Sequence, residues 1–139
     1  MAEHLEMVEK KVVDLQAWLD LPDVESLKGE YKIPKTELVV KFNAINESKL
    51  RRLRNIAKMS VDKGNAVAFK QSLGTLLVVH QAYEPNFADA ELLEKTNCVN
   101  AAEYVTRKLK PGYIEDISKR ILELSGFDDD MEDIDDAKN

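Results

Sequence analysis

The hydrophobic positions of this chain follow two different periods, and each period predicts a different kind of element. Within residues 3–19 the apolar side chains recur at spacings of three and four residues, which is typical of an amphipathic helix. These side chains are Leu5, Val8, Val12, Leu15 and Leu19. Two heptads are too few to predict a coiled coil. The pattern therefore predicts a helix that either packs on its own domain or forms an arm for a partner, with Trp18 at its end as an interface anchor.

The period changes to two in residues 38–44, where β-branched residues occupy both faces of the alternation. Alternation of this kind is typical of a strand. Tyr31 precedes this segment across Pro34, and proline is tolerated only at the end or edge of a strand. We therefore expect a short two-stranded antiparallel β element in the N-terminal third of the chain, after a loop marked by Pro22 and Gly29.

The rest of the chain predicts helices. Asn46 is a natural N-cap for a helix with an apolar stripe and a basic opposite face. Residues 67–82 are the most hydrophobic segment and predict a buried central helix, in which Gly74 indicates a close helix crossing. Further helices are expected after Asp89 and over residues 101–109. The predicted fold class is mainly α: a small domain of about five to six helices with the short β element.

The last predicted helix carries the clearest start and stop signals. Pro111 suits its first turn. Gly126 stands where a left-handed C-cap belongs, and Phe127 can fold back on the last turn. Upstream, Asn97 and Asn100 predict a tight turn, because asparagine tolerates left-handed backbone better than most residues.

The charge of the chain is concentrated at its C-terminus. The 139 residues include 20 Lys and Arg against 26 Asp and Glu, for a net charge of -6. Residues 128–139 hold seven acids and one base, which leaves 19 charges of each sign in residues 1–127. We therefore expect one mostly helical domain over residues 1–127, with residues 1–28 as a candidate N-terminal arm, and a disordered acidic tail over residues 128–139. Because positive and negative charges are equal in number in residues 1–127, this part of the chain lacks the basic surplus that phosphate binding needs, which argues against a nucleic-acid partner.

The sequence shows no combination of residues with the spacing of a catalytic, cofactor-binding or metal-binding site. One Cys and two His are too few for a usual four-ligand zinc site, and the acidic tail lacks the glycine and spacing of a calcium loop. Cys98 is expected to be a small turn or core residue, and His80 a core or rim histidine. The longest apolar run, residues 76–79, is far shorter than the ~20 residues of a membrane helix, and the N-terminus lacks a secretion signal. We expect a soluble protein that is not an enzyme and binds no membrane.

Three short motifs follow one another between Tyr83 and Phe127: PNFADAEL at 85–92, LKPGY at 109–113 and LELSGFD at 122–128. Their order and spacing resemble those of the XkdN-like family of phage tail assembly chaperones. The strand over residues 38–44 that runs into a charged helix is similar to a junction of the same family. Tyr113 stands where the family commonly has an acidic residue, and asparagines replace its usual turn glycine.

The resemblance implies a non-catalytic role in assembling the tail of a long-tailed phage or a prophage-derived particle. Such a chaperone binds the tape measure protein, keeps it soluble while the tail tube assembles, works in the host bacterial cytoplasm and is absent from the mature virion. Its other expected partners are further tail proteins or a second copy of itself. A helical client needs an exposed apolar surface on the chaperone. The candidate partner-binding residues are Leu5, Val8, Val12, Leu15, Trp18, Leu19, Tyr83 and Phe87.

A second interpretation of the sequence is a regulatory adaptor or inhibitor whose acidic tail occupies a basic partner. Truncation after Phe127 separates the two hypotheses. Client binding should largely survive the truncation in the chaperone, whereas a mimic of nucleic acid should lose binding and show steep salt sensitivity.

Overall fold

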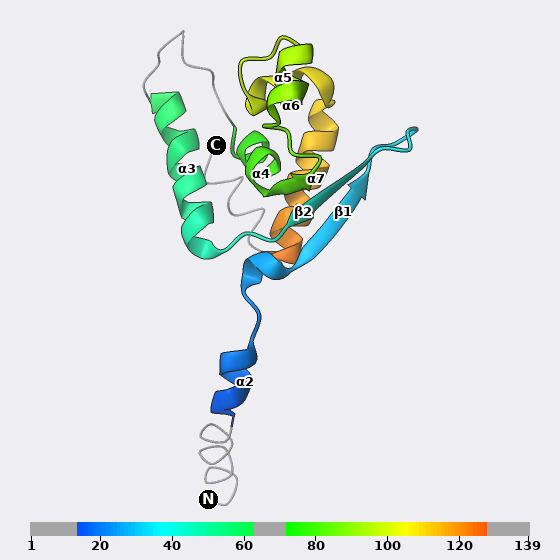
Figure 1. The fold of residues 1–139 in the computed structure, drawn as a ribbon. Helices are drawn as coiled ribbons and strands as arrows, with labels where there is room; N and C mark the ends of the chain where they lie inside the picture. The colour runs from blue at the N-terminus through cyan, green and yellow to red at the C-terminus, as the bar shows by residue number, and fades with distance from the viewer. Residues whose placement is uncertain (1–13, 63–71, 128–139) are drawn as a thin grey trace, which may run out of the picture.

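The computed structural model describes residues 14–62 and 72–127 of the chain (Figure 1). Six α-helices, one 3-10 helix and three strands lie in this part of the chain. In order they are α2 (Leu15–Asp20), η1 (Val24–Ser26), β1 (Lys28–Lys32), β2 (Val39–Asn43), α3 (Glu47–Asp62), α4 (Leu73–Gln81), β3 (Ala82–Glu84), α5 (Ala90–Lys95), α6 (Ala101–Lys108) and α7 (Pro111–Leu124). The prediction of a mainly α fold is confirmed. Among the described residues, no helix is both long enough and apolar enough to cross a membrane.

The sheet has three antiparallel strands in the order β1-β2-β3, rather than the two strands expected. β1 and β2 pair as predicted, with Tyr31 opposite Val40 and Gly29 opposite Phe42. Gly29 therefore lies in a strand and not in a loop. β3 pairs with the other edge of β2. It was missed because it has three residues and follows α4 directly, so it shows no alternation of its own.

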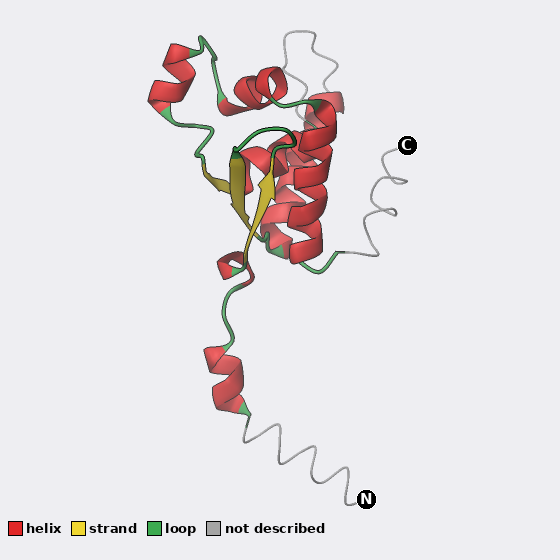
Figure 2. Cartoon of the chain, turned by 90° about the vertical axis from the view of Figure 1, so that its right-hand side faces the viewer, coloured by secondary structure: helices red, strands yellow, loops and turns green. Residues whose placement is uncertain are grey.

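α4 is the central helix of the body, as expected from its hydrophobicity. It contacts α3, α6, α7 and the strands β2 and β3. Figure 2 shows the helices gathered behind the sheet. The helix begins at Leu73, where the Ser72 hydroxyl accepts a hydrogen bond of 3.1 Å from the Thr75 amide. Part of the predicted helix, residues 67–71, lies outside the described residues. The largest fully buried side chains are Phe42, Ile45, Leu50, Leu53, Leu77, Val78, Val105, Ile117 and Ile121.

The predicted caps at the ends of α3 and α7 are confirmed. The Asn46 Oδ1 atom accepts a hydrogen bond of 2.8 Å from the Lys49 amide at the start of α3. α7 ends at Gly126, whose φ is +91°. The Phe127 amide donates to the Leu122 carbonyl at 2.9 Å, which is the closing bond of a Schellman motif. These bonds fix where the chain enters α3 and where it leaves α7.

The two asparagines before α6 have different roles. Asn97 has a φ of 56° and supplies the left-handed residue of the turn, as expected. Asn100 has a φ of -152°, so it is not left-handed, and its Oδ1 atom instead accepts a hydrogen bond of 2.8 Å from the Glu103 amide. Asn100 is therefore the N-cap of α6.

Candidate partner-docking surface

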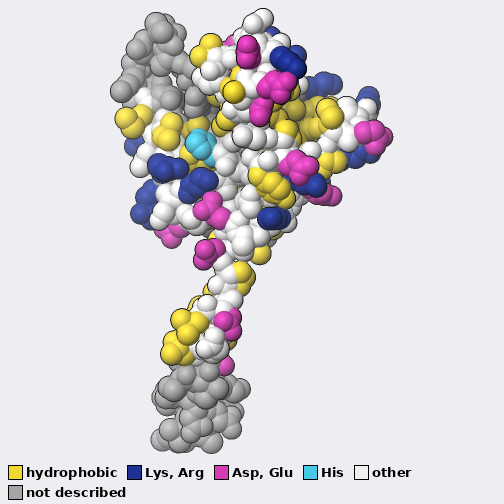
Figure 3. All heavy atoms as spheres, in the orientation of Figure 1, with side chains coloured by type: hydrophobic (Ala, Val, Ile, Leu, Met, Phe, Trp, Pro, Cys, Tyr) yellow, Lys and Arg dark blue, Asp and Glu magenta, His cyan; other side chains and the backbone are white. Residues whose placement is uncertain are grey.

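Helix α2 presents three large apolar side chains to solvent. Leu15, Trp18 and Leu19 are 62%, 70% and 69% exposed, and their spacing places them on one helix face. α2 has no buried residue and projects away from the body in Figures 1 and 2. Hydrophobic side chains gather on this projection in Figure 3. Full burial of each such side chain contributes ~1.5–3 kcal/mol. Burial of this face against a partner would therefore stabilise the complex.

The apolar surface continues along the chain beyond α2. Pro22 follows two residues after the end of the helix and prevents its extension. Leu21 is 61% exposed and Val24 is 42% exposed. The described arm therefore offers apolar side chains along its whole length from Leu15 to the body.

The base of the arm is fixed to the body through Glu25 in η1. Its Oε1 atom accepts a hydrogen bond of 2.9 Å from Asn46 Nδ2, and its Oε2 atom lies 3.3 Å from Lys49 Nζ. Gln81 Nε2 lies 3.4 Å from the same Oε2 atom, and the Glu25 carbonyl accepts a bond of 2.8 Å from Asn43 Nδ2. One residue thus joins the arm to β2, α3 and α4, a role that no sequence pattern indicated.

Gln81 closes this junction from the side of the core. Its side chain is only 2% exposed, and Nε2 donates a hydrogen bond of 2.8 Å to the Ala44 carbonyl. The Ala44 amide in turn donates to the Leu27 carbonyl at 2.9 Å. The arm is therefore held by backbone pairing as well as by side chains, so its attachment point is defined.

The structure locates only some of the residues predicted to bind a partner. Leu5, Val8 and Val12 lie outside the described residues. Leu15 and Leu19 lie on the exposed face of α2 together with Trp18, so the structure brings these three together.

The two aromatic candidates for partner binding outside the N-terminal helix, Tyr83 and Phe87, do not share an exposed surface. Tyr83 is 39% exposed, and the Lys28 ammonium lies 5.2 Å from the centroid of its ring. Phe87 is only 3% exposed and stacks on Tyr104 with a centroid distance of 5.8 Å. The prediction that Phe87 contributes to an exposed surface is therefore wrong, because this side chain belongs to the core.

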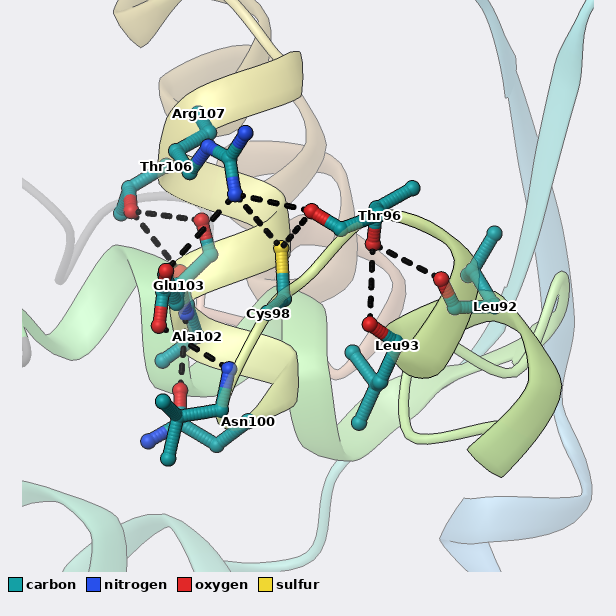
Figure 4. Close-up of polar contacts among 10 residues, drawn as sticks. Leu92, Leu93, Thr96, Cys98, Asn100, Ala102, Glu103, Thr106 and Arg107 are labelled. Carbon is teal, nitrogen blue, oxygen red and sulfur yellow. Dashed lines mark hydrogen bonds and ion pairs between the residues drawn. The ribbon is translucent and has the colours of Figure 1, made fainter.

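The single cysteine lies in the polar turn between α5 and α6 (Figure 4). Arg107 Nη1 donates a hydrogen bond of 3.1 Å to the Thr96 carbonyl and lies 3.2 Å from Cys98 Sγ. Glu103 Oε2 accepts a bond of 3.0 Å from the Val99 amide. These contacts tie the turn to α6, and Cys98 is a buried turn residue, as expected. Across the described ranges, no group of three or more His, Cys, Asp or Glu side chains could hold a metal ion.

An exposed apolar helix face on an anchored arm is a feature of proteins that bind other proteins. The family model for phage XkdN-like tail assembly chaperones matches residues 20–138. The match covers most of the chain, and the chain belongs to this family. The resemblance first seen between Tyr83 and Phe127 therefore extends toward both ends, while most of α2 lies just before the matched region. No protein of curated function and no solved structure matches the chain.

Proposed function

We propose that this tail assembly chaperone binds the tape measure protein and keeps it soluble while the tail tube assembles around it. The observation that supports this proposal is the exposed face of α2 with Leu15, Trp18 and Leu19. A long helical client aggregates through its apolar stripes, and an amphipathic helix can cover such a stripe. The chaperone would act in the host cytoplasm, without catalysis, and would leave before the virion is complete.

The geometry of the arm suits this role. α2 lies apart from the body, so an elongated client can lie against it without meeting the helices around α4 (Figure 1). Glu25 and Gln81 hold the base of the arm, which reduces the freedom lost when the client binds. The apolar face is thereby presented in a defined place rather than buried in its own domain.

The proposal is tested by co-expressing the tape measure protein with the full chain and with a Leu15→Glu/Leu19→Glu variant. We expect the soluble fraction of the client to fall with the variant, because two charges replace the apolar face. The matched control is Leu38→Glu/Val99→Glu, which replaces two apolar side chains that are 67% and 85% exposed on the body. The control should keep the client soluble.

Equal client solubility with the arm variant and with the unchanged chain would overturn the assignment of α2 as the binding face. Circular dichroism of both variants checks that the fold is kept. Light scattering tests whether α2 binds a second copy of the chain instead of the client. If the arm variant has a lower oligomer mass than the unchanged chain but still keeps the client soluble, α2 binds a second copy.

A further inference from the structure

Helix α3 carries a concentration of positive charge that the body does not neutralise. Its five basic residues are Lys49, Arg51, Arg52, Arg54 and Lys58. Lys49 pairs with Glu25, and Arg51 pairs with Glu47 four residues before it. No carboxylate among the described residues pairs with the remaining three. In Figure 3 Lys and Arg side chains gather over α3.

Three of the five basic residues are arranged along one side of α3. Arg51, Arg54 and Lys58 follow one another at spacings of three and four residues, so they form a stripe along the helix. The Arg54 Nε atom is buried and makes no hydrogen bond within the described part of the chain. An unsatisfied donor of this kind favours an acceptor at the same place. The face is therefore suited to carboxylates.

The acidic end of the chain begins next to this helix. Ser125 Oγ, just after α7, accepts a hydrogen bond of 2.8 Å from the Ile45 amide. Ile45 directly precedes Asn46, the N-cap of α3, and the acidic segment starts three residues after Ser125, at Asp128. The last described residues before the acidic segment therefore lie close to the start of the basic helix.

The length of the segment is sufficient to follow the helix. Residues 128–139 number twelve and span up to ~40 Å when extended. The 16 residues of α3 are about 24 Å long. The acidic segment can therefore lie along the whole basic stripe without moving any element of the body.

We infer that residues 128–136 dock on the basic face of α3 in the same chain. Each exposed ion pair contributes at most ~1 kcal/mol. Attachment at Phe127 raises the local concentration of the segment to about the millimolar range, so several weak pairs suffice. The family match runs to residue 138 and so includes this segment. Any partner that uses the same face must carry a comparable acidic segment and displace this one.

The test uses the full chain with a nitroxide at Ala137→Cys in a Cys98→Ala background, which keeps every charge of the segment. We expect loss of amide intensity for residues 51–58 in the 1H-15N spectrum. The loss should disappear in an Arg51→Gln/Lys58→Gln variant, which removes the two exposed cations of the stripe, and at about 1 M salt, where the Debye length is ~3 Å. The matched control, Lys108→Gln/Lys119→Gln, removes two exposed cations elsewhere and should keep the effect.

A second measurement needs neither the label nor the change at Cys98. Replacing the seven acids of residues 128–136 by Asn and Gln should shift the amide resonances of α3 and leave those of α6 in place. Intensity loss spread evenly over the body, or unchanged α3 resonances, would overturn the inference. A loss that grows with protein concentration would also overturn it, since the tail of a second copy would then occupy α3.

Discussion

The carboxylate of Glu25 and the side-chain amide of Asn46 are joined by a hydrogen bond of 2.9 Å. Asn46 uses its other side-chain atom, Oδ1, to cap α3 through the Lys49 amide. The ammonium group of Lys49 then returns to Glu25 at 3.3 Å. Because these three residues form a closed set of contacts, the position of the arm and the start of α3 depend on the same side chains.

Replacing Glu25 by Gln should weaken the attachment of the arm. The substitution removes the negative charge that faces Lys49 but keeps the shape of the side chain. Since the Glu25 side chain is 37% exposed, we expect the free energy of unfolding to fall by only ~0.5–1 kcal/mol. Urea denaturation measures this loss, and limited proteolysis between Leu21 and Leu27 should become faster.

The matched control for this prediction is Glu30→Gln on β1. The side chain of Glu30 is exposed and forms no ion pair with the described residues. Its replacement should change neither the unfolding free energy nor the proteolysis rate. An equal effect of both substitutions would show that the loss of net charge, and not the contact with Asn46 and Lys49, is the cause.

Gly29 is the glycine of β1 that a larger residue cannot replace. A Cβ atom at this position would lie 2.8 Å from Cε1 of Phe42 and 3.4 Å from Cδ2 of Leu124. Because the Phe42 ring is only 2% exposed, it has no space to move. We expect Gly29→Ala to lower the free energy of unfolding by ~1–3 kcal/mol, measured by thermal or urea denaturation.

Gly74 in α4 provides the contrast. A Cβ atom there would lie 3.5 Å from Ser118 Oγ and 3.8 Å from Ile114 Cγ2, which are ordinary contacts. The expected crossing with α7 exists, but it leaves room for a methyl group. Gly74→Ala should therefore stabilise the protein by up to ~1 kcal/mol. Destabilisation by Gly74→Ala as large as that by Gly29→Ala would contradict this account.

The elements that sequence analysis predicted well are those whose boundaries depend on neighbouring residues. Asn46 caps α3, and Pro111 and Gly126 bound α7, because caps act over one helical turn. β3 could not be predicted in this way. Its three residues are a strand only because β2 offers a free edge, and that edge comes from residues some 40 positions earlier.

In the candidate site, too, features that depend on neighbouring residues could be predicted, and features that depend on residues distant in sequence could not. The apolar face of α2 followed from the helical spacing of Leu15 and Leu19, which is a local pattern. Its exposure did not follow, because the same spacing also fits a helix packed on its own domain. The contacts of Glu25 with Asn43 and Gln81 span 18 and 56 residues of sequence, so no local pattern contains them. Phe87 was predicted to bind a partner because a helical client needs exposed apolar side chains, although a buried position is usual for phenylalanine.

Tyr31 should make stability fall at alkaline pH. Its ring is 6% exposed, and its hydroxyl donates a hydrogen bond of 3.0 Å to Asp116 Oδ2. Burial first, and then the bond to Asp116 and its charge, raise the pKa of Tyr31 above 10.0, while Arg120 acts in the opposite direction. Above that pH the unfolded chain loses the proton before the folded chain does. The stability contributed by Tyr31 is therefore complete below about pH 10 and is lost as the pH rises through the folded pKa.

Unfolding free energies of the unchanged chain and of Tyr31→Phe, measured between about pH 8 and about pH 11, check this prediction. The variant should be less stable by ~1 kcal/mol at the lower pH and should decline less steeply toward the higher pH. Tyr83→Phe is the matched control, because Tyr83 is 39% exposed. An alkaline decline as steep in Tyr31→Phe as in the unchanged chain would exclude this tyrosine as its source.

His80 should report the positive charge of α3 directly. Partial burial first, and then the charges of Lys49 and Arg52, lower the pKa of His80 below 6.5. The unfolded chain therefore takes up a proton before the folded chain, and the stability contributed by neutral His80 is present above pH 6.5 and lost as the pH falls toward the folded pKa. In an NMR titration of the His80 ring, assigned with His80→Asn, Arg52→Gln should raise this pKa. Arg51→Gln should leave it in place, because Arg51 faces Glu47. Equal shifts in both variants would mean that His80 senses the net charge of the chain and not the neighbouring face of α3.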